Sequence, residues 1–138
     1  MTSPAEPLLD TIDRLRQHDP RFRREAYVFV IASLGAAVDG MPHDRRADPE
    51  RRHLHGSEVV TAAVRLARRE FGPLAATVFR EWGVTGARDI GDIVFQLVEA
   101  GQLSATPDDR IEDFLGGPEL LQALSDAAPR AARPRGGA

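Results

Sequence analysis

The sequence predicts an all-α fold, a compact bundle of five to seven short helices containing a helix-turn-helix-like hairpin, with no sheet. Apolar residues recur three and four positions apart along most of the chain, as they do on the buried face of a helix. Glycine, proline and capping residues separate these stretches at intervals typical of short helices. A length of 138 residues, with 42% apolar and 28% charged residues, suits one globular domain. We therefore expect a single helical domain over residues 8–127, between a disordered lead at 1–7 and a disordered Arg/Ala/Pro/Gly tail at 128–138.

The N-terminal part predicts two helices. The first is a short amphipathic helix from Leu8 to Gln17. The second extends from Arg21 to about Asp39, with Asp19 as its N-cap and Pro20 in its first turn. Five residues of its apolar run AYVFVIASL could also form a strand, but the three-and-four spacing of its largest side chains favours a helix.

A polar loop is expected from His43 to His55, and it separates the second helix from the third. The third helix is predicted from Ser57 to Phe71. Gly72 and Pro73 then break it and start a fourth, because proline suits a first turn and cannot continue a helix.

Residues 73–104, PLAATVFREWGVTGARDIGDIVFQLVEAGQLS, predict two helices joined by a tight turn. Gly83 is placed as a left-handed helix stop, and Val84 is placed to fold back onto the preceding turn. Asp89 is expected to cap the next helix and Gly101 to end it. Two short helices joined in this way form the helix-turn-helix-like hairpin.

The C-terminal part predicts two more helical segments. The sequence TPDD beginning at Thr106 is a helix start signal, after which Ile111, Phe114 and Leu115 would face inward. A last short helix is expected from Pro118 to Ala127.

Four spaced blocks carry a resemblance to other sequences: DPRFRREAYVFV at 19–30, RHLHGSEVV at 52–60, FGPLAATVFREWGV at 71–84 and DIGDIVFQLVEAGQLS at 89–104. In this order they resemble the core of a family of small uncharacterised bacterial proteins. That family has no assigned activity, so no catalytic residue can be carried over from the resemblance. It does imply Ser or Thr at His55, where such a residue would form a capping box with Glu58. Since histidine caps poorly, either Ser57 starts the helix later or the loop is arranged differently.

Missing residue types exclude several chemistries. The chain has no Cys and no Lys, so it lacks thiol nucleophiles, thiolate metal ligands, Schiff-base lysines and the lysine of a phosphate-binding P-loop. No apolar run reaches the roughly 20 residues needed to span a bilayer, and the start MTSPAEPLLD does not resemble a secretory signal. We expect a cytoplasmic protein without a membrane partner.

The charges argue against DNA recognition by the hairpin. Its second helix, as predicted from Asp89, contains three acidic residues and no basic residue. The acids are Asp89, Asp92 and Glu99. Residues 89–115 hold seven acids and one arginine, a net charge of −6, which phosphates would repel. The hairpin is therefore expected to be a packing unit.

Arginines in the 43–55 loop and in the tail could still bind nucleic acid or the ribosome. These are Arg45, Arg46, Arg51, Arg52, Arg130, Arg133 and Arg135. Three acids in the loop reduce its net charge to +1, and a sequence pI near 5.8 is not that of a typical nucleic-acid binder.

A second specific hypothesis is a metal site, with His53, His55 and Glu58 as its candidate ligands. Zinc accepts histidine and carboxylate at short spacings. However, no H-E-x-x-H pattern places these residues on one helical face, and the neighbouring arginines repel a cation. No bound metal or cofactor is expected.

We expect a non-enzymatic protein-interaction or self-associating module, and we assign no catalytic residues. The predicted interaction surface is the acidic C-terminal face together with the lone tryptophan. Its residues are Trp82, Asp92, Glu99 and Glu112. A nucleic-acid- or ribosome-associated factor is the alternative, and an enzyme ranks third.

Overall fold

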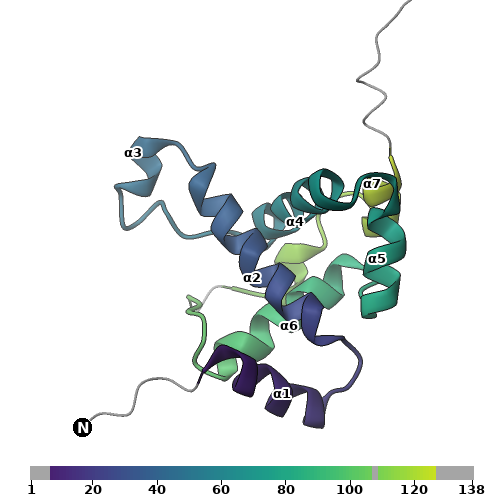
Figure 1. Cartoon of the computed structure of the whole chain (residues 1–138). Coiled ribbons are helices and arrows are strands. Elements are labelled where there is room, and N and C mark those ends of the chain that lie inside the picture. Colours follow the sequence, from purple (N-terminus) through teal and green to yellow (C-terminus); the bar gives the residue numbers. More distant parts are fainter. Residues whose placement is uncertain (1–6, 107–108, 127–138) are drawn as a thin grey trace, which may run out of the picture.

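The computed structural model describes residues 7–106 and 109–126, and in these residues the chain is helical without a strand (Figure 1). The α-helices are α1 (Leu8–His18), α2 (Arg24–Asp39), α3 (His43–Arg46), α4 (Gly56–Phe71), α5 (Ala75–Trp82), α6 (Ala87–Glu99) and α7 (Leu120–Ser125). Two 3₁₀ helices, η1 (Gly72–Leu74) and η2 (Ile111–Phe114), complete the described part. The prediction of an all-α fold is confirmed. No helix among these residues is long and apolar enough to cross a bilayer. Residues 1–6 of the expected lead and the tail arginines lie outside the described residues.

Helices α2 and α4 form the centre of the bundle. They pack along each other, and α5, α6, η2 and α7 surround them. Large core side chains come from the loop before α2 and from several helices, and they include Phe22, Tyr27, Phe79, Ile93 and Leu97. Figure 1 shows that α3 and the C-terminal end of α2 extend away from the other helices.

Helix α2 begins at Arg24, three residues later than predicted, and Asp19 is not its cap. The Arg23 N–H donates instead to the carbonyl of Trp82, at 3.0 Å, and Phe22 is buried. Residues 19–23 therefore lie against the C-terminal end of α5. The local capping signal was wrong because these tertiary contacts hold the backbone outside the helix.

The turn after α5 forms as predicted. Gly83 has a left-handed φ of 88°, and the Val84 N–H donates to the Phe79 carbonyl at 2.9 Å, with Val84 buried. Helix α6 starts at Ala87, two residues before Asp89, which lies in its first turn and accepts bonds from the N–H groups of Thr85 and Gly86. Helix α5 packs against α2, α4 and α7, whereas α6 packs against α2 and η2. The helix-turn-helix interpretation of this pair stays a prediction.

The C-terminal part differs most from the prediction. Of the expected helix near Thr106 the structure has only η2, beginning at Ile111, while 107–108 lie outside the described residues. Phe114 is buried as expected, but Leu115 is 44% exposed, so its inward placement was wrong. Helix α7 starts at Leu120 because the Glu119 carboxylate accepts bonds from the N–H groups of Leu121 and Gln122, a side-chain cap.

Candidate functional site

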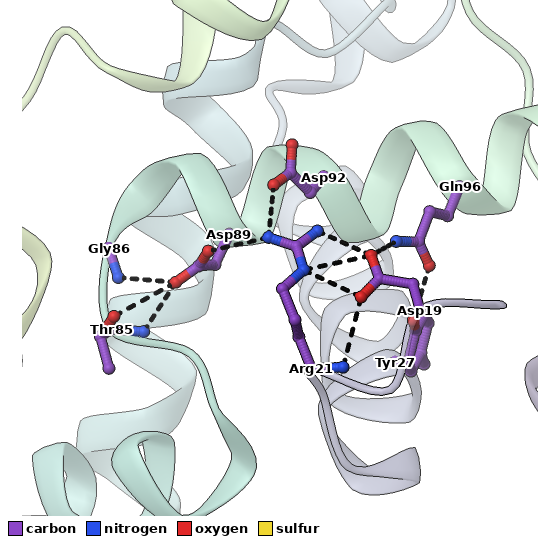
Figure 2. Close-up of polar contacts among 8 residues, drawn as sticks. All are labelled: Asp19, Arg21, Tyr27, Thr85, Gly86, Asp89, Asp92 and Gln96. Atoms are coloured by element: carbon purple, nitrogen blue, oxygen red, sulfur yellow. Dashed lines mark hydrogen bonds and ion pairs between the residues drawn. The ribbon is translucent and has the colours of Figure 1, made fainter. Parts of the chain in front are cut away.

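One arginine joins the loop before α2 to α6. The Arg21 guanidinium donates to Asp19 at 2.7 and 2.9 Å and to Asp92 at 3.2 Å, and it lies 3.8 Å from Asp89 (Figure 2). Asp19 also accepts a bond from the Gln96 side chain, at 2.8 Å. These five residues form what we call the Arg21 network.

Burial and charge shift the ionisation of this network. The bonds from Arg21 lower the pKa of Asp19 against the opposing effect of partial burial. Tyr27, which is fully buried, donates its hydroxyl to Gln96 at 2.6 Å. Burial raises the pKa of Tyr27 to about 12, so its hydroxyl stays a neutral donor. The network is a set of satisfied structural bonds that fixes α6 against the N-terminal loop.

The four predicted interaction residues lie on α5, α6 and η2. Asp92 is engaged by Arg21, and Trp82 is half-buried among Phe29, Phe71 and Phe79, with ring centroids 5.4 to 5.7 Å away. Glu99 and Glu112 are exposed on separate elements. The interaction surface predicted from these four residues stays a prediction.

Arg45 closes the loop between α3 and α4. Its guanidinium binds the Glu58 carboxylate through two nitrogens, one of them at 2.8 Å, and it donates to the backbone carbonyls of Arg51 and His53 at 2.6 and 2.9 Å. Glu58 in turn accepts a bond from the His55 N–H at 2.9 Å. Helix α4 thus begins at Gly56, with His55 in the N-cap position. The Glu58 carboxylate, in the first turn of the helix, accepts the hydrogen bond from the N–H of this cap residue. The loop is arranged so that it does not need a Ser or Thr cap.

Two of the candidate metal ligands are bound to other partners, and the rings of His53 and His55 lie near each other, with centroids 6.3 Å apart. His53 Nε2 lies 2.8 Å from Asp109, Glu58 is paired with Arg45, and His55 is exposed. Partial burial opposes ionisation of Asp109, yet the bonds from His53 and the Thr106 N–H outweigh it and lower the pKa of Asp109. The part of the chain that the structure describes contains no group of three such residues able to hold a metal. Among the loop arginines, Arg46 and Arg52 form no ion pair within the described residues, and Arg51 lies 3.8 Å from Asp44.

A groove of about 440 Å³ lies between the end of α2 and the outer side of α4. We call it the α2–α4 groove. Its apolar lining residues are Ala36, Ala37, Met41, Leu54, Ala62 and Leu66, and its charged lining residues are Arg45, Glu58, Arg65 and Arg69. Arg65 has no ion pair in the described residues, and Arg69 has only a long contact of 3.7 Å with Glu70.

Sequence reasoning missed this groove. The available signal was the spacing of Arg65 and Arg69, which lie one helical turn apart around Leu66. The opposite wall could not be predicted, because it depends on the C-terminal end of α2 lying beside α4.

The Arg45–Glu58 pair predicts a stability that depends on acid pH. The bonds from Arg45 lower the pKa of Glu58 from its ordinary 4.5 to about 2. The stabilisation is therefore fully present above pH 4.5 and is lost as the pH falls toward 2. Because the carboxylate is one-third exposed, solvent screening reduces the contribution of the pair to the free energy of unfolding to about 1 to 2 kcal/mol.

Urea unfolding from pH 6 down to pH 2.5, roughly the range in which this carboxylate titrates, measures the effect. Glu58→Gln should lose less stability than the wild type over this range. Glu70→Gln, which alters the long contact to Arg69, is the matched control and should follow the wild type. Equal pH dependence in wild type and Glu58→Gln would show that the pair contributes nothing.

Comparisons with family models, with curated proteins and with solved structures found no match for this chain. The resemblance carried by the four sequence blocks therefore stays a prediction, and the functional argument rests on the geometry of the site.

Proposed function

We propose that this chain is a cytoplasmic, non-enzymatic protein-interaction module that holds an acidic amphipathic helix of a partner protein in the α2–α4 groove. The observation that carries the proposal is the combination of an apolar groove lining with two arginines that no strong ion pair occupies. An amphipathic helix lying in an apolar groove is a recurrent mode of peptide recognition.

The charges of the groove favour an acidic partner. Arg45 is neutralised by Glu58 and restrained by two backbone carbonyls, so it belongs to the wall. Arg65 and Arg69 are exposed and contribute the remaining charge. They are separated by one turn of α4, about 6 Å, which is also the separation of carboxylates four residues apart on a partner helix.

The shape of the groove agrees with a helical partner. The groove follows α4 from Ser57 to Arg69, a rise of about 18 Å along the helix. Alanines on both walls leave room for a second backbone to approach closely. A partner helix with leucines on one side and glutamates beside them would place apolar side chains on the apolar lining and carboxylates next to Arg65 and Arg69.

Nucleic acid is the alternative that the same experiment tests. Arg46, Arg51 and Arg52 are exposed, but Arg45 is occupied by Glu58. Phosphate binding through the loop would weaken steeply with salt and would not depend on Arg65 and Arg69.

The test uses a labelled amphipathic peptide of Glu, Leu and Ala residues, with a Lys-for-Glu version as the peptide control. Fluorescence anisotropy should show binding of the acidic peptide only. Arg65→Glu with Arg69→Glu should weaken this binding by about tenfold, since each exposed pair contributes up to about 1 kcal/mol. Arg80→Glu, an exposed arginine on α5, is the matched control and should leave the affinity unchanged.

Two results would overturn the proposal. One is equal binding of the acidic and basic peptides. The other is no peptide binding together with salt-sensitive binding of a labelled oligonucleotide, which would establish the nucleic-acid function instead.

A further inference from the structure

Helix α2 has an apolar outer face that no described element of the chain covers. Between Glu25 and Asp39 the helix contains no charged residue. Its inner face is buried, whereas Val28, Ala32 and Gly35 are exposed on the outside, with Ile31 beside them. Val28 keeps 42% of its surface exposed. We call Val28, Ile31, Ala32 and Gly35 the outer face of α2.

A helix that is apolar on all sides is normally buried on all sides. The four residues of the outer face recur at spacings of three and four, the pattern of a seam between two packed helices. The face therefore has the composition and the spacing of an interface.

We propose that a second copy of this chain covers the outer face of α2, in a two-fold symmetric antiparallel pairing centred between Ile31 and Ala32. In a two-fold contact the same surface serves both subunits, so each residue must meet a suitable residue of the same helix. In this register Val28 lies opposite Gly35 of the partner subunit, and Arg24 lies opposite Asp39 of the partner subunit.

The apolar pairs of this register are complementary in size. A Cβ added to Gly35 would meet nothing within 4 Å, so this position is a recess open to the outside. Val28 is the most exposed large apolar side chain of the helix. A valine entering the recess above a glycine lets the two helices approach closely.

The charged pairs at the ends of the seam are complementary in sign. Asp39 is exposed and forms no ion pair among the described residues. Arg24 binds Asp13 through Nε and Nη2, at 2.8 to 3.2 Å, which leaves Nη1 to reach a second carboxylate. Because Arg24 and Asp39 lie at opposite ends of the same face, an antiparallel partner places opposite charges together at both ends, while a parallel one does not.

The dimer is independent of the proposed peptide binding. The α2–α4 groove uses Ala36 and Ala37 of α2 and Met41 beyond the end of the helix. Ala37 lies on the side of α2 away from Val28, and Ala36 lies at the edge of the outer face, one turn after Ala32. A dimer formed through the outer face would carry one open groove on each subunit.

Sedimentation equilibrium over a range of protein concentrations tests the proposal on the full chain. The wild type should show a monomer–dimer equilibrium. Ala32→Glu and Gly35→Leu should each raise the dissociation constant by at least about tenfold. Thr77→Glu, at an exposed position of α5, is the matched control and should leave it unchanged.

Gly35→Ala separates an effect on the interface from an effect on folding. Alanine is a better helix former than glycine, and its Cβ meets nothing in the monomer, so the melting temperature should rise at protein concentrations where the chain is monomeric. The same Cβ would obstruct Val28 of the partner subunit, so the dimer should weaken. A wild type that stays monomeric at all concentrations, or a dimer that Ala32→Glu and Gly35→Leu leave intact, would overturn the proposal. Either result leaves the peptide-binding test unaffected.

Discussion

Replacing Gly83 by alanine is expected to destabilise the fold by about 3 to 5 kcal/mol. At a φ of +88° any side chain is strained, which costs about 1 to 2 kcal/mol. In addition, the new Cβ would overlap the carbonyl oxygen of Arg21 and lie 3.3 Å from its carbonyl carbon. These are backbone atoms, so relief requires residues 21–23 to move. That movement would break the bond from Arg23 to the Trp82 carbonyl and disturb the buried Phe22.

Gly101→Ala is the matched control for this substitution. Gly101 also ends a helix, has a φ of +81°, and has nothing within 4 Å of an added Cβ. It should therefore show only the conformational cost, about 1 to 2 kcal/mol. The difference between the two variants in urea unfolding measures the close approach of residues 21–23 to the end of α5. Equal losses at the two glycines would contradict that packing.

Truncating Phe114 to alanine is expected to cost about 3 to 4 kcal/mol. The ring is 5% exposed and lies edge-on to Phe95, with centroids 6.0 Å apart. It also contacts two glycines, since a Cβ added at Gly56 or Gly91 would lie 2.7 or 3.0 Å from its Cδ1. The ring thus fills the space between the start of α4 and the first half of α6, and its loss would leave a cavity there.

Leu115→Ala provides the comparison, because the neighbouring leucine is 44% exposed. It should cost less than about 1 kcal/mol in thermal or urea unfolding. If the two variants lost equal stability, η2 would not be anchored through Phe114.

Local signals predicted the helix ends that depend on local chemistry. Gly83 and Gly101 both adopt the left-handed conformation that a helix stop requires, and Val84 folds back as expected. Such signals succeed because the backbone bonds they describe connect residues within one turn.

The predictions failed where distant residues decided the outcome. Asp19 had the sequence of a helix cap, but its carboxylate is bound by Gln96, 77 residues away, and by Arg21. Helix α2 therefore starts at Arg24 instead of the predicted Arg21.

The candidate site shows the same limit. Summing charges predicted a nearly neutral 43–55 loop, but it could not predict that Arg45 would pair with Glu58 and His53 with Asp109. These pairings leave Arg65 and Arg69 as the accessible charges beside the apolar groove. Only the packing of α2 on α4 shows this, because the groove is formed by residues from both helices.

The Arg21 network has a consequence for the kinetics of folding. The bond from Arg21 to Asp92 spans 71 residues, and the bond between Asp19 and Gln96 spans 77. Closing a loop of this length costs entropy that one exposed ion pair cannot repay, so the network forms only after α2, α4 and α6 have assembled. Interactions that form after the transition state act mainly on the unfolding rate. We therefore expect loss of the network around Arg21 to speed unfolding and to leave the folding rate, which depends on the apolar faces of the central helices, nearly unchanged.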